Sequence, residues 1–505
     1  MKLPPALPSV FRLRGQFACV AATLLLTACG GSGGDPFELL PGSGNTGAAS
    51  QYAQQCSASN PYRGDAEAST RSGTLATEKQ WVRAYIDQAY LWYDNVPSVN
   101  ASLPEYSSDN SGGYYDSIDA YFSALTVSGV PDDRFSFTYP TKQWKELSES
   151  GVTLGYGIEF SIASATPPRG VRVAYVEPNS PAAAAQVRRG DTLVTVDGVP
   201  IDDASSTGVA TINAALFPSA AGNHTFVFSR QGATLPTVAL AAGNITSTPV
   251  PQSTVLTVGS AKVGYVVFND HVLTAEGQLA SAVSSLSTQG VNDLVLDLRY
   301  NRGGYLFIAS QLAYMVAGQA RTENKTFERL QYNDKRTSDT NNSATPFYSC
   351  EFRGGNNCAA DLPALNLGRV YVLSGPDTCS ASEAVINGLR GIDVEVVVVG
   401  GTTCGKPYGF TAKDNCGVSY FPIEFKGVNA KGFGEYADGF TATCPADDDF
   451  DRALGDTSER LLSIALNHRA TGSCGSGGLA KGAAPSTSRL LHRPERGGRY
   501  VVPRG

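Results

Sequence analysis

The stretch Gly368–Gly401, GRVYVLSGPDTCSASEAVINGLRGIDVEVVVVGG, decides the fold class. Its first and last parts are continuous apolar runs rich in β-branched residues, which is typical of buried strands. The middle part, Ser380–Gly391, has the length and apolar spacing of a helix. Buried strands that alternate with helices predict an α/β core.

The segment upstream of this stretch repeats the alternation. Lys262–Asp270 (KVGYVVFND) has the pattern of a buried strand, and Ala275–Gly290 (AEGQLASAVSSLSTQG) has that of an amphipathic helix. Val291–Leu306 (VNDLVLDLRYNRGGYL) predicts a strand that ends in a glycine turn. We therefore expect the α/β core to occupy residues 247–469.

A small helical domain is predicted over residues 76–150. Glu78–Pro97 and Tyr114–Thr126 place aromatic and aliphatic residues near helical spacing. Such a stripe is more typical of a packed helix face than of a ligand site. We therefore expect two helices that share an aromatic core.

Residues 151–246 carry short β-rich runs separated by glycine and proline, and they resemble a PDZ domain. The resemblance rests on LGYGIEF (Leu154–Phe160) and SPAAAAQVRRGDTLVTVDG (Ser180–Gly198). It implies that the backbone of Gly155, Tyr156 and Gly157 binds the terminal carboxylate of a peptide that adds to the sheet as a strand.

The composition limits the classes of function. The chain has 505 residues, of which 42% are hydrophobic, so it can bury more than one core. The formal net charge is −7 and the body of the chain has no basic cluster, which argues against nucleic-acid binding and favours protein or peptide partners. Residues 470–505 are rich in glycine, serine and arginine, and we predict a disordered tail there.

The N-terminus predicts export and lipidation. Residues 1–28 contain basic residues followed by an apolar stretch that is too short to span a bilayer. The sequence LTAC, Leu26–Cys29, resembles a bacterial lipobox, which implies lipid on Cys29 and a location on the outer membrane or periplasmic face of the cell envelope. We expect residues 29–75 to be a flexible tether. An ordinary secretory signal is the alternative.

Cysteine usage fits an exported protein. The sequence has 10 cysteines, and removing Cys19 with the signal and Cys29 with the lipid leaves eight, which suggests disulfides. Sequence proximity favours the pairs Cys350–Cys358 and Cys404–Cys416. No Cys-x-x-Cys pair occurs, so a zinc site is disfavoured. We expect neither a metal nor a cofactor.

The most reactive candidates are a serine and a lysine. Ser380 stands between a predicted strand end and a helix start, where a nucleophile is exposed and the helix N-terminus stabilises negative charge. Lys406 follows the next strand, which returns the chain to the same end of the sheet. None of the 4 histidines has a local triad signature. Burial among apolar groups lowers the pKa of a lysine, so we expect Lys406 to accept the serine proton.

These segments resemble the tail-specific, or C-terminal-processing, serine peptidases (peptidase family forty-one). The resemblance rests on SASE at Ser380, TCGK at Lys406 and DLRYNRGG before the predicted glycine turn. It implies a crotonase-like (ClpP-like) core in which Ser380 is the nucleophile and Lys406 the general base. The N–H of Ala381, with that of Gly303 or Gly304, would form the oxyanion hole. Substrates would be unfolded or tail-exposing proteins.

Several alternatives stay open. Phe410 stands where many family members have a glutamine that orients the lysine, so the partner of the amine is undetermined. Cys379 or Ser382 could replace Ser380 as nucleophile. The acidic run Ala446–Asp456 could bind calcium. A catalytically silent PDZ lipoprotein that binds peptides is the alternative function.

Overall fold

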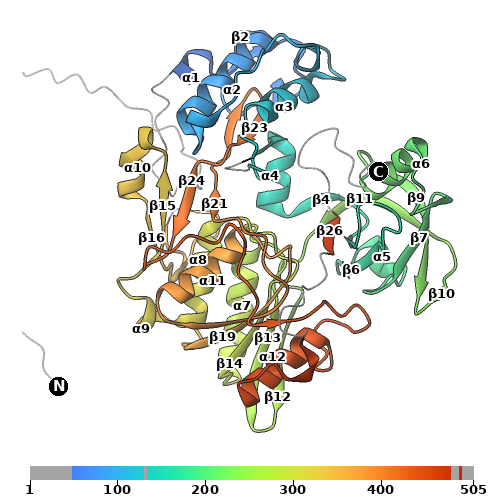
Figure 1. Cartoon of the computed structure of the whole chain (residues 1–505), viewed down its shortest axis with the longest axis vertical. Helices are drawn as coiled ribbons and strands as arrows, with labels where there is room; N and C mark the ends of the chain where they lie inside the picture. The colour runs from blue at the N-terminus through green and yellow to red at the C-terminus, as the bar shows by residue number, and fades with distance from the viewer. Residues whose placement is uncertain (1–47, 130–132, 356, 479–487, 492–505) are drawn as a thin grey trace, which may run out of the picture.

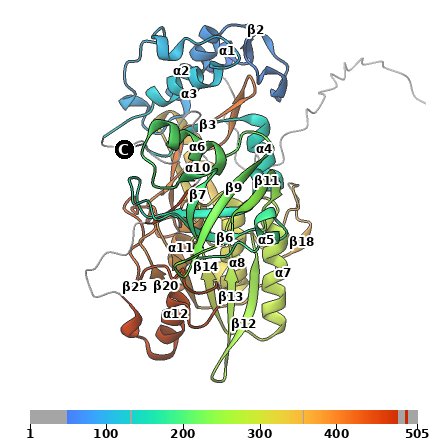
Figure 2. The ribbon, with the colours of Figure 1, turned by 90° about the vertical axis from the view of Figure 1, so that its right-hand side faces the viewer.

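A computed structural model describes residues 48–129, 133–355, 357–478 and 488–491. The predicted signal peptide and Cys29 lie outside the described residues. Three parts are visible in Figure 1: N-terminal helices, a β-rich domain and an α/β core. Figure 2 shows the N-terminal helices at one end of the molecule and helix α12 (Arg460–Thr471) at the other. Within the described residues, no helix combines the length and apolar character needed to cross a bilayer.

The N-terminal part contains the two predicted helices and additional structure before them. Its elements are α1 (Ala48–Tyr52), β1 (Gln55–Ser57), β2 (Arg71–Gly73), α2 (Leu75–Ala89), α3 (Tyr114–Ala124), β3 (Phe137–Pro140) and α4 (Thr141–Ser150). Trp81, Ile86, Tyr114 and Phe122 are at most 1% exposed, so the predicted aromatic core is confirmed.

The structure differs from the predicted tether in its second half. Residues 48–75 include α1 and the parallel pair β1–β2, and Cys56 is joined to Cys416 by a disulfide. Sequence composition suggested a tether because these elements are short and polar. They are held in place by the disulfide and by the packing of α1 on α2 rather than by a long apolar pattern.

The β-rich domain is an antiparallel sheet in the order β26-β5-β6-β7-β9-β11-β4. Its elements are β4 (Val152–Gly155), β5 (Ile158–Ile162), β6 (Arg172–Val176), α5 (Pro181–Ala184), β7 (Thr192–Val196), β8 (Val199–Pro200), α6 (Ser206–Leu216), β9 (Gly222–Arg230), β10 (Ala233–Thr234) and β11 (Val238–Thr246). Phe226, Phe228 and Val196 are fully buried between the sheet and helices α5 and α6.

The edge strand β26 (Arg489–Leu491) corrects the prediction of a disordered tail. It belongs to the C-terminal region of the chain but pairs with β5 of the β-rich domain. Earlier in the same region, Cys474 forms a disulfide with Cys444. The composition of this region gives no periodic signal and predicts disorder. The disulfide and the pairing of the three-residue strand β26 nevertheless hold the described parts of the region in place.

The core is a six-stranded sheet in the order β12-β13-β14-β19-β20-β25, parallel from β13 to β25. Its elements are β12 (Gln252–Val258), β13 (Ala261–Val267), α7 (Ala275–Thr288), β14 (Asp293–Asp297), α8 (Leu306–Ala317), β19 (Arg369–Ser374), α11 (Ala381–Gly391), β20 (Glu395–Gly400), β25 (Cys444–Pro445) and α12. Helices α7, α8 and α11 cover one face, and α12 packs on the other. The predicted α/β core is confirmed.

Two small sheets connect the core to the N-terminal part. Their strands and the adjoining elements are α9 (Gln319–Thr322), β15 (Thr326–Tyr332), α10 (Thr337–Asn342), β16 (Ala344–Pro346), β17 (Cys350–Glu351), β18 (Ala360–Asp361), β21 (Tyr408–Gly409), β22 (Lys413–Asn415), β23 (Val418–Phe421) and β24 (Phe425–Val428). Strand β3 of the N-terminal part pairs with β23. The N-terminal part is therefore packed beside the segment that follows Lys406.

Candidate active site

Three loops meet at one edge of the core sheet. Strands β14, β19 and β20 are parallel neighbours, so their carboxyl ends lie together. The glycine turn follows β14, the Ser380 segment follows β19, and the Lys406 segment follows β20. The three segments that the sequence singled out are thus gathered at the end of the sheet where α/β proteins place their sites.

Ser380 lies in the turn that begins α11. Its backbone has φ 56° and ψ −115°, a conformation that a serine adopts only when the surrounding structure holds it. The side chain is partly exposed, while Ala381, the first residue of the helix, is 2% exposed. A strained, accessible hydroxyl at the N-terminus of a helix has the exposure and local field that a nucleophile requires.

The carboxylate of Glu383 joins the serine segment to the lysine segment. Its Oε2 accepts hydrogen bonds from the N–H of Ser380 (3.0 Å) and of Lys406 (2.8 Å). Its Oε1 accepts from the N–H of Gly405 (2.9 Å) and from Thr403 Oγ1 (2.5 Å). Burial raises the pKa of Glu383 although these donors oppose the shift. Sequence reasoning missed this role, which the S-x-x-E spacing of a capping box could have suggested.

A disulfide between Cys379 and Cys404 makes the same connection covalently. The two Cα atoms are 5.1 Å apart, and the cysteines immediately precede Ser380 and the Gly405–Lys406 pair. Cys379 therefore has no free thiol to act as a nucleophile. The expected pair Cys404–Cys416 is wrong, because Cys416 is bonded to Cys56.

The expected local pair Cys350–Cys358 is confirmed. The two cysteines are 8 residues apart in sequence. Cys350 lies on β17, and Cys358 lies in the turn that leads to its partner strand β18. Sequence proximity thus predicted the disulfide within a hairpin and failed for those that join distant segments.

The amine of Lys406 lies against aromatic rings. Its Nζ is 4.3 Å from the centroid of the Phe410 ring and 5.2 Å from that of Phe135. Phe135 comes from the N-terminal part of the chain, and the guanidinium of the adjacent Arg134 donates a hydrogen bond to Cys404 O (3.4 Å). Phe410 thus contacts the amine through its ring.

The glycine turn contacts the nucleophile directly. A Cβ placed on Gly303 would be 2.8 Å from the N atom of Ala381 and 2.8 Å from the Cβ of Ser380. Gly303 has φ 96° and Gly304 has φ 136°, which are conformations that favour glycine. A Cβ on Gly304 would be 2.6 Å from His271 O. Both glycines are therefore required by close backbone approach.

Asn301 and His271 hold this turn in place. The Asn301 Oδ1 atom accepts hydrogen bonds from the Gly303 N–H (2.9 Å) and the His271 ring at Nδ1 (2.8 Å). The Asn301 carbonyl accepts from the N–H of Cys379 (3.1 Å) and from the Ser382 hydroxyl (3.0 Å). Burial lowers the pKa of His271 to about 4, so its ring is neutral and supports the turn.

The predicted oxyanion donors are not equivalent. The N–H of Gly303 is bonded to Asn301, whereas the N–H groups of Ala381 and Gly304 donate none of the hydrogen bonds found among the described residues. Ala381 is the first residue of α11, where the N–H has no partner within the helix. Ser382, the alternative nucleophile, is fully buried and bonded to Asn301 O.

The predicted carboxylate loop of the β-rich domain joins β4 to β5. The carbonyl of Gly157 accepts from the Glu177 N–H (2.8 Å), and that of Tyr156 accepts from the Ala182 N–H (3.1 Å). The Tyr156 side chain is 3% exposed and its hydroxyl donates to Ala215 O (2.8 Å). These carbonyls and this side chain are directed into the domain, and Gly155 is the last residue of β4.

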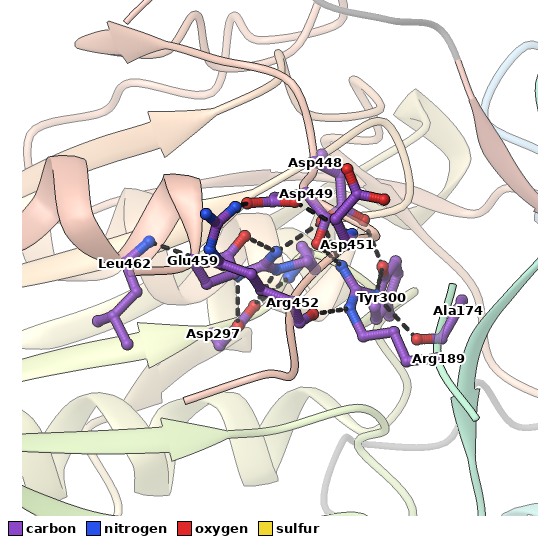
Figure 3. Close-up of polar contacts among 12 residues, drawn as sticks. Ala174, Arg189, Asp297, Tyr300, Asp448, Asp449, Asp451, Arg452, Glu459 and Leu462 are labelled. Carbon is purple, nitrogen blue, oxygen red and sulfur yellow. Dashed lines mark hydrogen bonds and ion pairs between the residues drawn. The ribbon is translucent and has the colours of Figure 1, made fainter. Parts of the chain in front are cut away.

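Aspartates of the acidic run Ala446–Asp456 form ion pairs with arginines (Figure 3). Asp448 Oδ1 is 2.6 Å from a guanidinium nitrogen of Arg189 and 2.6 Å from one of Arg299. Asp449 pairs with Arg452 at 3.0 Å. Burial opposes ionisation of Asp448, but the two arginines lower its pKa to about 2. The run therefore ties the β-rich domain, through Arg189, to the core.

Comparisons with known proteins agree with this architecture. Residues 262–413 match the model described as Peptidase family S41. Residues 77–137 match the Peptidase S41 N-terminal domain, and residues 172–209 match a PDZ domain. A crystal structure of an S41 protease from Bacteroides fragilis has a TM-score of 0.60 and 24% identity, covering 78% of this chain and 97% of that one. This similarity shows a shared fold.

Two curated relatives are similar in sequence. The chain is 28% identical over 255 residues to the chloroplastic C-terminal processing peptidase of Tetradesmus obliquus, over 46% of this chain and 51% of the relative. It is 26% identical over 204 residues to the carboxyl-terminal-processing protease of Picosynechococcus sp., over 40% of this chain and 48% of the relative. The chain thus spans about half the length of these relatives. In these three matched segments, the chain is similar to the peptidase domain of family S41, to the family's N-terminal domain and to a PDZ domain.

Proposed function

We propose that the chain is a serine endopeptidase that uses Ser380 as nucleophile and Lys406 as general base. The observation that carries the proposal is the double connection of these two segments through the Glu383 carboxylate and the Cys379–Cys404 disulfide. Such a connection fixes the relative position of nucleophile and base, which is what a two-residue catalytic unit needs.

The reaction follows from the chemistry of the two groups. The neutral amine of Lys406 accepts the proton of the Ser380 hydroxyl as Oγ bonds to the carbonyl carbon of the scissile peptide bond. When the C–N bond breaks, the ammonium group returns this proton to the leaving amine, and the acyl group stays on Ser380. A water molecule then loses a proton to Lys406 and attacks the ester carbonyl. When the bond from this carbon to Ser380 Oγ breaks, the ammonium group returns the proton to Oγ, and the acid leaves.

The oxyanion formed in each step needs hydrogen-bond donors. We assign this role to the N–H groups of Ala381 and Gly304, because the N–H of Gly303 already donates a hydrogen bond to Asn301. The N-terminal end of α11 adds a favourable dipole at the same point. Asn301 and His271 are positioning residues in this scheme, since they hold the turn and do not touch the reacting atoms.

We propose that the PDZ domain binds the substrate's C-terminal tail. In this proposal the C-terminal tail of a protein substrate adds to the sheet as a strand beside β5, with its carboxylate at the loop of Gly155, Tyr156 and Gly157. Unfolded or tail-exposing proteins would be the substrates, because only they offer an extended terminus.

We further propose that the protein acts outside the cytoplasm, held to the cell envelope by lipid on Cys29. The four disulfides found among the described residues support export, because disulfides persist in oxidising compartments. The lipobox-like sequence supports the anchor.

Hydrolysis of an unstructured protein tests the activity. We expect the full chain to cleave β-casein and the variant Ser380→Ala to lose at least about 10³-fold of the rate, since the nucleophile carries the covalent step. Ser338→Ala, on the exposed side of α10, is the matched control and should cleave normally. Gel electrophoresis and mass spectrometry of the fragments report the rates.

The silent peptide-binding alternative predicts a different result. In that case neither the full chain nor Ser380→Ala would cleave casein. Cleavage that persists in Ser380→Ala would instead overturn the assignment of the nucleophile.

A further inference from the structure

The strand β26 pairs with the edge strand of the PDZ domain. Arg489 lies opposite Ile162, Leu490 opposite Ser161, and Leu491 opposite Phe160, in antiparallel register. Figure 1 shows β26, in red, beside the β-rich domain and apart from α12, the preceding helix of the chain. A distant segment of the chain thus completes this sheet.

The direction of β26 is that of a peptide ligand. Strand β5 begins at Ile158, directly after the loop of residues 155–157, and β26 runs antiparallel to it. The C-terminal end of β26, at Leu491, is therefore its end nearest to that loop. A strand added to an exposed sheet edge, with side chains in alternate pockets, is the recognition mode expected of a bound peptide.

Both leucines of β26 are buried. Leu491 is 5% exposed and belongs to the hydrophobic core of the PDZ domain, near Phe160. Leu490 is 5% exposed and packs with Ala174 of the PDZ domain and Tyr300 of the peptidase core. Alternate side chains thus fill two different apolar environments on the two sides of the strand.

The strand also contacts the active-site segment. The N–H of Leu490 donates a hydrogen bond to Asp377 Oδ2 (2.7 Å), and Asp377 lies three residues before Ser380. Arg302, beside the glycine turn, is 3.9 Å from the other carboxylate oxygen of Asp377. A strand in this position therefore lies between the PDZ edge and the turns that hold Ser380.

The segment brings cations to a group of buried carboxyl groups. Glu159, Glu177, Asp270 and Asp377 are close enough to interact electrostatically with one another or with Arg302, and burial raises the pKa of each. Arg489 adds an opposite charge near Asp377. The sequence around β26 is basic, with arginines at positions 489, 493, 496 and 499 against one glutamate at 495.

We propose that the segment 488–491 is a built-in ligand of the PDZ domain that competes with substrate tails for the edge of β5. The proposal rests on the proposed function for its consequence, which is autoinhibition, whereas the occupancy itself does not depend on catalysis. Release of the segment opens the edge of β5 and frees Asp377 beside the nucleophile.

A binding measurement in the full chain tests the occupancy. The probe is a fluorescein-labelled, amidated peptide of residues 485–494, and the receptor carries Ser380→Ala so that no cleavage can occur. Adding Leu491→Asp places a charge in the PDZ core and should release the segment. We expect this receptor to bind the peptide at least tenfold more tightly than its parent, as measured by fluorescence anisotropy.

Leu491→Met is the matched control, because it keeps an apolar side chain of similar volume and should bind the peptide as weakly as the parent. A chain that ends at Thr487 removes the segment without altering the PDZ core, and it should bind the peptide as the Leu491→Asp receptor does. Equal affinity in the parent and the chain ending at Thr487, or binding to neither, would overturn the occupancy.

Casein cleavage by the same variants with Ser380 restored tests autoinhibition separately. Leu491→Asp and the chain ending at Thr487 should cleave at least threefold faster than the unmodified chain and Leu491→Met. If all four proteins cleave casein at equal rates while the binding results are as expected, the segment occupies the edge of β5 but does not compete with substrate tails, and autoinhibition is overturned. Absence of cleavage in all four would contradict the proposed function and leave the binding result unaffected.

Discussion

Lys406→Arg is expected to lose about 10³–10⁴-fold of kcat/KM while keeping the positive charge. The guanidinium group does not lose its proton in the pH range of enzyme assays, so it cannot accept one from Ser380. The aromatic contacts of the side chain with Phe135 and Phe410 can persist in the variant, since arginine also stacks on such rings. The lost activity therefore reports the base rather than the charge.

Lys431→Arg is the matched control for this change. Its side chain is 53% exposed and pairs with Asp393, so an arginine there should leave kcat/KM unchanged. The unmodified enzyme should lose activity as the pH falls, because acid protonates the Lys406 amine and also Glu383, whose pKa burial has raised. Casein cleavage at several pH values measures both effects. Near-normal turnover of Lys406→Arg would rule out the dyad.

Arg299→Met is expected to destabilise the folded chain by about 3–5 kcal/mol. The guanidinium is 2% exposed and lies 2.9 Å from Asp297, 2.8 Å from Glu459 and 2.6 Å from Asp448. Methionine has a similar length but no charge, so these carboxylates would stay buried without their counter-charge. Urea denaturation followed by intrinsic fluorescence measures the loss.

Arg452→Ala is the surface control, because its side chain is 47% exposed and its pair with Asp449 should contribute only about 0–1 kcal/mol. The loss of stability in Arg299→Met should be measurable at neutral pH. Asp448 has its pKa lowered to about 2, so its contribution is present above the ordinary carboxyl pKa and is lost as the pH falls towards 2. An Arg299→Met chain as stable as Arg452→Ala would contradict this account of the network.

The α/β core was predictable because its strands are long apolar runs. VYVLS and VEVVVV can be buried on both faces only between layers of helices, and the intervening helix places Ser380 at the carboxyl end of β19. The same topology brings Lys406 and the glycine turn to that edge. Local patterns therefore indicated which residues meet, since parallel strands align their carboxyl ends.

The connections between the site segments were less predictable. Cys56 and Cys416 are 360 residues apart in sequence, and Cys379 and Cys404 are 25 apart, so proximity gave the wrong partner for Cys404. Disulfide pairing depends on the distance between Cα atoms in the fold. The role of Asn301 likewise depends on a turn geometry that its sequence neighbours do not specify.

Strand β26 had no local signal at all. Three residues are too few for a strand pattern, and the surrounding glycine, serine and arginine content is that of a chain without a core. Its stability comes from the edge of β5, which is more than 300 positions away in sequence, and from the apolar environments of its two leucines. Composition alone therefore predicted disorder.

The most direct measurement of the central claim is the site of covalent labelling by a fluorophosphonate, which reacts with activated serine hydroxyls. Peptide mapping by mass spectrometry should find the label on Ser380 of the full chain, and both Ser380→Ala and Lys406→Arg should lose it. Ser382 should stay unlabelled, since it is buried and bonded to Asn301. Labelling of another serine, or undiminished labelling of Ser380 in Lys406→Arg, would contradict a serine peptidase that depends on this dyad.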